Sequence, residues 1–148
     1  MAKEMTRQEI DDFLYKQRIG LLSLTNGNDA YAVPMGYSYD GTHIYIAMIY
    51  KGRKIEYLKK NKNISFVVYW TNEDIHVGNI HWKSVICDGI MEHLKEHKGI
   101  EKAVRTAEKH LSLTEGTWDR LITKAIEDPD NSMFWKINIQ HISGRFMG

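Results

Sequence analysis

The sequence predicts a mainly β protein of the α+β class, with an antiparallel sheet that curls into a barrel and helices that flank it. Short segments rich in β-branched and aromatic residues alternate with Gly, Pro, Asn and Asp, which is typical of an antiparallel meander. Two of these segments, 44–49 and 64–69, are apolar on both faces, whereas antiparallel strands usually leave one face to water. Burying both faces in so short a chain requires a curled sheet that helices or a second subunit cover from outside. We therefore expect a homodimer.

Length and composition predict one globular domain over residues 1–148, with 43% hydrophobic residues. The 20 basic residues balance 19 acidic ones, so no global field attracts nucleic acid or an anionic membrane, and any basic function has to be local. No apolar run approaches the roughly 20 residues of a membrane span, and the N-terminal segment lacks the apolar core of a signal peptide. We expect a cytoplasmic protein.

The first third of the chain predicts one helix followed by a three-stranded meander. Thr6 and Glu9 match a capping box, and apolar residues at helical spacing extend the helix over 6–18. The expected strands are 19–25, 30–39 and 42–49. Pro34 falls within the second strand and cannot donate a ladder hydrogen bond, so an edge or a bulge is expected there. Such an irregularity fits the border of a site and a simple barrel corner equally well.

The rest of the chain predicts a short basic helix, two long strands, a pair of helices and a closing strand. The basic helix begins near Arg53, directly after Gly52, and is followed by a strand at 63–70 and a loop. Apolar spacing and turn residues place the remaining elements. They are a strand over 81–94, helices over 98–111 and 114–127, and a last strand over 133–142.

The start of the basic helix is the strongest local signal for a ligand. Arg53 and Lys54 occupy the first turn, where the positive end of the helix dipole repels cations and favours anions. Free backbone N–H groups, a dipole and two cations together form a suitable phosphate site. Lys59, Lys60 and Lys62 lie at the other end of the helix, where cations belong without a ligand.

Other residues that can carry chemistry have plainer interpretations. Cys87, in the apolar run SVICDGI, reads as a packed strand cysteine. His93 and His97 match an H-x-x-E-H zinc pattern, but the match straddles a strand end and a helix start, so no metal site is predicted. His76 and His81 lie in a loop, as solvated residues or as proton donors to a substrate. The four tryptophans are dispersed, which favours core or interface anchors over a base-stacking platform. They are Trp70, Trp82, Trp118 and Trp135.

These elements resemble the flavin-binding split β-barrel family, which includes pyridoxamine 5′-phosphate oxidase and the nitroimidazole-resistance flavoproteins. The resemblance covers most of the chain and rests on four stretches in a fixed order. They are IGLLSLTNGNDAYAVPMGY with its mid-strand proline, DGTHIYIAMIYKGRKIEYLKKNKNISFVVY, WKSVICDGIMEHL and INIQHISGRF.

The resemblance implies an antiparallel split β-barrel that forms a homodimer and binds FMN at the subunit interface, with the phosphate near Arg53 and Lys54. The matching positions imply further flavin neighbours on three strands: Pro34, Met35, Gly36, Ala47, Met48, Ile49, Trp82, Lys83 and Ser84. Nitroimidazole-resistance members often carry histidine where this chain has Ala47, so no role of that histidine carries over. The arginine-rich C-terminal substrate segment of a pyridoxamine phosphate oxidase is not matched before Gly148, so the vitamin substrate is not expected.

The implied activity is that of an FMN-dependent oxidoreductase, which passes electrons from a reduced nicotinamide or another donor to a small-molecule acceptor. No catalytic side chain stands out, in keeping with redox chemistry that belongs to the cofactor. The alternatives are a non-catalytic flavin- or haem-binding carrier or sensor, a deazaflavin as the cofactor, and a nucleic-acid module that uses the basic segment 51–62.

Overall fold

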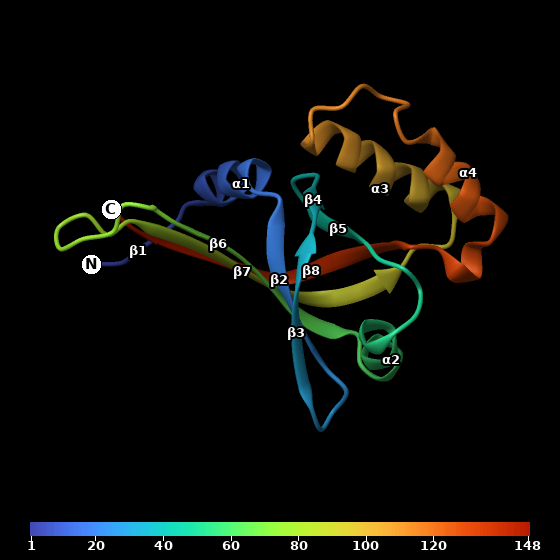
Figure 1. Cartoon of the computed structure of the whole chain (residues 1–148), viewed down its shortest axis with the longest axis horizontal. Helices are drawn as coiled ribbons and strands as arrows, with labels where there is room; N and C mark the ends of the chain where they lie inside the picture. Colours follow the sequence, from blue (N-terminus) through green and yellow to red (C-terminus); the bar gives the residue numbers. More distant parts are fainter.

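The computed structural model describes residues 1–148, whose strands form one eight-stranded antiparallel sheet accompanied by four α-helices (Figure 1). The strands are β1 (Lys3–Glu4), β2 (Ile19–Thr25), β3 (Ala30–Gly36), β4 (Ser38–Tyr39), β5 (His43–Ala47), β6 (Asn63–Thr71), β7 (Trp82–His93) and β8 (Phe134–Met147). The helices are α1 (Arg7–Lys16), α2 (Arg53–Lys60), α3 (His97–His110) and α4 (Asp119–Glu127), with a short 3-10 helix at Pro129–Asn131. None of the helices is long and apolar enough to cross a membrane.

The order of the strands explains why the sheet curls. Along the sheet the order is β3-β2-β6-β7-β8-β5-β4, with β1 paired to β8 outside this path. The two edge strands, β3 and β4, are therefore consecutive in the chain and are separated only by Tyr37. Because one residue cannot span an open sheet, the sheet bends until its two edges approach each other. The predicted curled antiparallel sheet is confirmed, and Pro34 lies in an edge strand, as expected.

The single strand predicted over 30–39 is wrong at Tyr37. The N–H of Tyr37 donates to the carbonyl oxygen of Arg18 (3.0 Å), and its hydroxyl donates to the carbonyl oxygen of Leu14 (2.7 Å). These contacts hold Tyr37 against the residues just before β2, and the residues that follow Tyr37 pair with β5 instead. Other predicted boundaries also shift: α1 ends at Lys16, β5 ends at Ala47, α4 begins at Asp119 and β8 continues to Met147.

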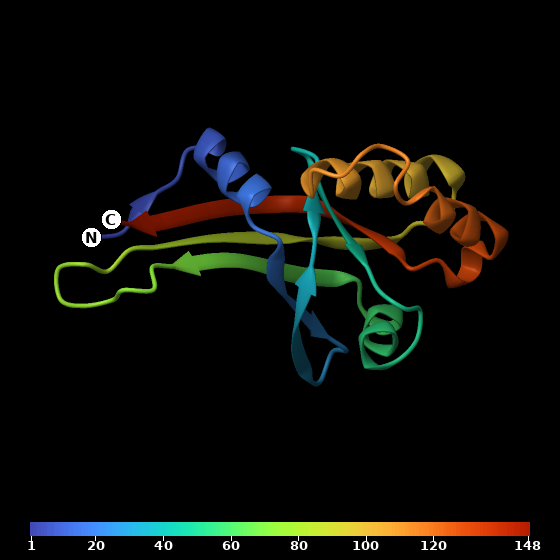
Figure 2. The same cartoon turned by 45° about the horizontal axis from the view of Figure 1, so that its top comes forward.

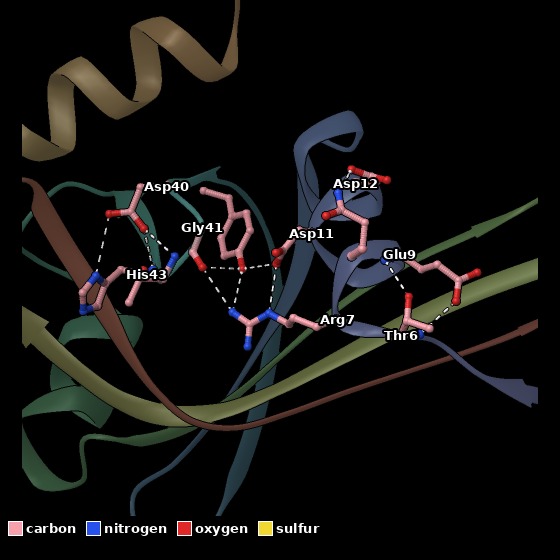
Figure 3. Close-up of polar contacts among 11 residues, drawn as sticks. Thr6, Arg7, Glu9, Asp11, Asp12, Asp40, Gly41 and His43 are labelled. Carbon is pink, nitrogen blue, oxygen red and sulfur yellow. Dashed lines mark hydrogen bonds and ion pairs between the residues drawn. The ribbon is translucent and has the colours of Figure 1, made fainter.

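Helix α1 is fixed at its start and along its side. Thr6 and Glu9 form the predicted capping box, with N–H to side-chain oxygen distances of 2.9 and 3.2 Å. The hydroxyl of Tyr39 donates to a carboxylate oxygen of Asp11 (2.7 Å). Arg7 donates to the same Asp11 oxygen (3.0 Å) and to the carbonyl oxygen of Gly41 (3.1 Å), as Figure 3 shows. This network ties α1 to the turn between β4 and β5.

The chain has two hydrophobic cores, one on each face of β5. Ile44 and Ile46 point into the larger core inside the curl, together with residues of α1, α2, β2 and β6. Tyr45 points the other way into a smaller core that α3 and α4 cover. In Figure 2, α1, α3 and α4 lie on one side of the long β6–β7–β8 ribbon, and α2 lies on the other. Helices therefore cover the second apolar face of β5, as the sequence required.

The second apolar face of β6 has no such cover. Tyr69 is 65% exposed, and Ile86, on the neighbouring strand, is 42% exposed. Beyond this face, β6 and β7 extend as a projecting arm whose end, the loop 72–80, lies far from α2 in both views (Figures 1 and 2). The arm also exposes large apolar side chains, namely Trp70, Ile75, Val77 and Ile80. So much exposed apolar surface is typical of an interaction site.

Candidate functional site

A cavity of about 490 Å³ opens at the start of α2. It joins an edge strand, the end of β5 and the connection to α2. Its lining residues are Met35, Ala47, Met48, Ile49, Lys51, Gly52 and Lys54. Five of the predicted site residues thus lie around one cavity, with an apolar wall on one side and two lysines on the other.

The backbone around this cavity leaves its polar groups available. Gly52 has a φ of 96°, a left-handed conformation that favours glycine, and it precedes α2 without a side-chain cap. The N–H groups of the first turn of α2 therefore have no capping partner. The N–H of Met48 donates to the carbonyl oxygen of Met133 (2.8 Å), which anchors the connection to β8. An uncapped helix start beside Lys51 and Lys54 is suited to an anionic group.

The two cations predicted to share the phosphate point in different directions. Lys54 lines the cavity, whereas the Arg53 guanidinium lies 4.0 Å from the centre of the Tyr31 ring and 5.4 Å from that of Tyr57. Arg53 also donates to the Tyr57 hydroxyl (3.4 Å), and this hydrogen bond is the main cause that raises the pKa of Arg53. In this conformation, Lys54 is the first-turn cation at the cavity and Arg53 is a cation held on two aromatic rings.

Pro34 and Gly36 are on the opposite face of β3 from Met35. Side chains alternate along a strand, and β3 is partly buried at Met35 but exposed at Pro34 and Gly36. Pro34 borders a separate cavity of about 450 Å³ with the end of α1, the start of β2 and Tyr69. Gly36 borders a third, apolar cavity beneath α3.

Trp82, Lys83 and Ser84 are remote from α2 within one chain. Asn63, which closely follows α2, pairs with Ile90, whereas Lys83 pairs with Trp70 on the projecting arm. Seven residues of strand separate Lys83 from Ile90, which is roughly 23 Å at the usual rise per residue. One chain therefore does not bring these three residues to the α2 cavity.

Sequence reasoning missed two lining residues, Lys51 and Gly52. The signal was present, because both belong to the same turn and basic run as Lys54. It also did not anticipate a larger cavity, of about 1020 Å³, between β5 and α3. That cavity holds none of the predicted site residues, and much of its charge is paired within the protein, as between Lys136 and Glu92 (3.7 Å).

The other residues singled out in the sequence have structural partners. Cys87 is fully buried in the larger core, and burial raises the pKa of its thiol to about 12. The His93 ring stacks on Tyr50 and Trp135, with centroids 4.4 and 4.7 Å away, and its Nε2 bonds to the carbonyl oxygen of Ser132 (2.7 Å). Burial is the main cause that lowers the pKa of His93. Trp135 is buried, as predicted for an anchor.

The curled sheet, with its edges joined through Tyr37 and a basic helix start beside β5, defines a split-barrel protein with a candidate site for an anionic, partly apolar ligand. The sequence profile of the pyridoxamine 5′-phosphate oxidase family matches residues 6–146. The chain belongs to that family. No curated protein sequence matched it.

Solved structures agree with this assignment. An FAD-binding protein from Mesorhizobium loti is 27% identical, with a TM-score of 0.72 and coverage of 100% of this chain and 99% of that one. A candidate 5-nitroimidazole antibiotic resistance protein from Bacteroides thetaiotaomicron is 17% identical, with a TM-score of 0.82 and coverage of 99% and 87%. The flavocytochrome Anf3 from Azotobacter vinelandii is 15% identical, with a TM-score of 0.73 and coverage of 99% and 69%. At their low identities, the last two show similarity of fold alone.

Proposed function

We propose that this protein binds a flavin nucleotide, FMN, with its phosphate at the start of α2. The observation that carries the proposal is the α2 cavity, which combines an apolar wall with Lys51, Lys54 and an uncapped helix start. A flavin needs a flat apolar slot for its ring and an anion site for its phosphate. The family assignment supports a flavin, and so does the FAD-binding protein that is 27% identical over the whole chain.

The flavin site is completed by a second copy of the chain. Trp82, Lys83 and Ser84 lie on the projecting arm, too far along β7 to reach the α2 cavity of their own chain. The same arm exposes Tyr69 and Trp70, which a partner would bury. A two-fold arrangement would let the arm of each subunit reach the cavity of the other, so that one contact both buries the apolar surface and encloses the cofactor.

The proposed activity is electron transfer from a reduced nicotinamide or another donor to a small-molecule acceptor. Flavin supplies the redox chemistry when bound. The seven residues that line the α2 cavity include no histidine, cysteine or carboxylate, and its only ionisable side chains are Lys51 and Lys54. The protein's own residues therefore bind the phosphate and shape the slot rather than supply a nucleophile or a proton. The alternative is a flavin carrier or sensor that does not turn over.

The visible absorption spectrum of the purified protein, followed by flavin titration, tests the cofactor. We expect the bands of an oxidised flavin, and chromatography of the released cofactor distinguishes FMN from FAD. Lys54→Ala should weaken flavin binding by about 1.5–3 kcal/mol, or roughly tenfold to 150-fold in Kd. Lys60→Ala, at the exposed far end of the same helix, is the matched control and should bind as the parent does.

Equal flavin affinity of the Lys54 and Lys60 variants would show that the phosphate lies elsewhere. A Soret band in the visible spectrum would show that the bound cofactor is haem rather than flavin. Anaerobic mixing with NADH or NADPH then separates the enzyme from the carrier. Bleaching by a nicotinamide, with colour restored by a quinone or a nitroaromatic, supports turnover. Reduction by dithionite alone supports the carrier.

A further inference from the structure

The third cavity, which is apolar and about 260 Å³ in volume, lies beneath α3, next to β4 and β5. It is built from β4, β5, α3, the residue before α4 and the start of β8. Its lining residues are Gly36, Tyr37, Ser38, Tyr45, Ile46, Ala47, Ala103, Ala107, Leu111, Trp118 and Phe134. No acidic or basic side chain is among them.

Small side chains keep this space open. Ala103 and Ala107 are four residues apart on α3 and therefore share one face of that helix. Ala47 lies opposite, at the end of β5, where strand alternation places it on the same face as Tyr45. A dry apolar cavity of roughly 150 Å³ is enough to hold benzene, so 260 Å³ is suited to a molecule of one substituted ring or two fused rings.

Ser38 contributes a hydroxyl group to the lining of this cavity. Ser38 is only 4% exposed and pairs across the sheet with Tyr45, so both side chains point towards α3. The other hydroxyls of the lining are already engaged, because Tyr45 donates to Asp40 (3.0 Å) and Tyr37 donates to Leu14 (2.7 Å). The Ser38 hydroxyl takes part in no hydrogen bond within the chain and is therefore available to a ligand in this cavity.

The apolar cavity adjoins the candidate flavin cavity. Ala47 lines both, and Met35 and Gly36, which are consecutive in the chain, line one each. The two spaces therefore meet at the end of β5. A molecule in the apolar cavity would lie beside whatever occupies the α2 cavity.

We infer that the apolar cavity binds the redox partner of the flavin, an uncharged planar molecule of one or two rings whose carbonyl or nitro oxygen accepts a hydrogen bond from Ser38. The flavin part of this inference rests on the proposed function. The ligand is uncharged, because burying an ion among apolar side chains without a partner of opposite charge is costly. Ala107 sets the size limit and Ser38 sets the preference for an oxygen acceptor.

Equilibrium binding of two probes, 1,4-naphthoquinone and naphthalene, to the flavin-loaded protein tests the cavity. The probes share a shape, but only the quinone has oxygen acceptors. Ala107→Phe fills the space and should weaken both probes by more than tenfold. Lys109→Phe places the same ring on an exposed position of α3 and should change neither. Ser38→Ala should weaken the quinone about threefold to tenfold, the usual effect of one neutral hydrogen bond, and should leave naphthalene unchanged.

Flavin titration of the same variants separates this inference from the proposed function. Unchanged flavin affinity in Ala107→Phe, together with the loss of both probes, supports a distinct subsite. The inference would be overturned if the parent protein bound neither probe, or if the Ala107 and Lys109 variants bound the probes equally well. It would also be overturned if Ser38→Ala changed the affinity for the two probes equally. If the variants change probe binding as expected but the protein binds no flavin, the inference about the apolar cavity is supported and the proposed function is wrong.

Discussion

Replacing Glu108 by glutamine should destabilise the protein far more than an ordinary helix substitution. Glu108 is only 1% exposed, although it lies in the charged sequence of α3. One carboxylate oxygen accepts from Arg105 (2.7 Å) and from the N–H of Gly116 (3.3 Å), and the other accepts from the N–H of Trp118 (2.8 Å). The side chain thus holds the loop between α3 and α4, including Trp118 at the edge of the apolar cavity.

The magnitude follows from these three hydrogen bonds. Glutamine keeps the shape but turns one acceptor into an NH₂ donor, which then faces Trp118 N–H or the Arg105 guanidinium. At least one charge-assisted bond, at about 1.5–3 kcal/mol, is lost, and a buried donor remains unpaired. Arg105 is partly exposed and can find water, which limits the total. We expect the free energy of unfolding to fall by about 2–4 kcal/mol at neutral pH.

Urea unfolding at several pH values checks this expectation, with Glu101→Gln as the control on the exposed face of α3. That control removes a surface pair with His97 and should cost less than about 1 kcal/mol. Burial by itself raises the pKa of Glu108, but the hydrogen bonds from Trp118, Arg105 and Gly116 outweigh burial and lower it. The stabilisation by the carboxylate is therefore complete above the ordinary carboxyl pKa and is lost as pH falls through the lowered value.

The difference between the parent protein and Glu108→Gln should accordingly be constant near neutral pH and shrink in acid. A loss at neutral pH no larger than that of Glu101→Gln would contradict the role assigned to the buried carboxylate. A difference that grew on acidification would contradict the direction of the pKa change.

Three further outcomes follow from the sheet. Tyr69→Asp, on the uncovered face of β6, should convert a dimer into monomers in light scattering, and a monomeric parent would remove the interface. Gly20→Ala places a Cβ against the Phe66 ring, so the urea midpoint should fall by the equivalent of about 1–3 kcal/mol; an unchanged midpoint would show that the ring moves freely. Cys87 should react with a thiol reagent only after denaturation, since it is buried with a raised pKa; prompt reaction of the native protein would refute this.

Local chemistry made much of this protein predictable from its sequence. The capping box at Thr6 and Glu9 specifies the start of α1 through atoms three residues apart, and the Gly52 turn sets the start of α2. The limits of β2 match the prediction, because its apolar alternation and turn residues are contiguous. The second apolar face of β5 required cover, and α3 and α4 provide it. The ordered motifs correctly pointed to the pyridoxamine 5′-phosphate oxidase family.

Contacts between distant segments decided the rest. The run around Tyr37 is divided because the residues before Tyr37 pair with β2, whereas the residues after it pair with β5. Arg53 and Lys54 are neighbours with one predicted role, yet the aromatic rings of Tyr31 and Tyr57 hold Arg53 apart from the cavity that Lys54 lines. The charge pattern of the sequence cannot show which of the two cations faces the cavity, because the direction of each side chain depends on the residues that the fold brings into contact with it.

The sequence by itself determined the fold class, the elements and the basic helix start, because periodicity, capping and turn chemistry act within a few residues. Only the tertiary structure decided which apolar face α3 and α4 cover and which remains open on the arm. It alone brought Ser38, Ala47 and Ala107, from three different elements, around one apolar space. That space exists because short side chains from separate segments meet, and their meeting is a property of packing rather than of any local pattern.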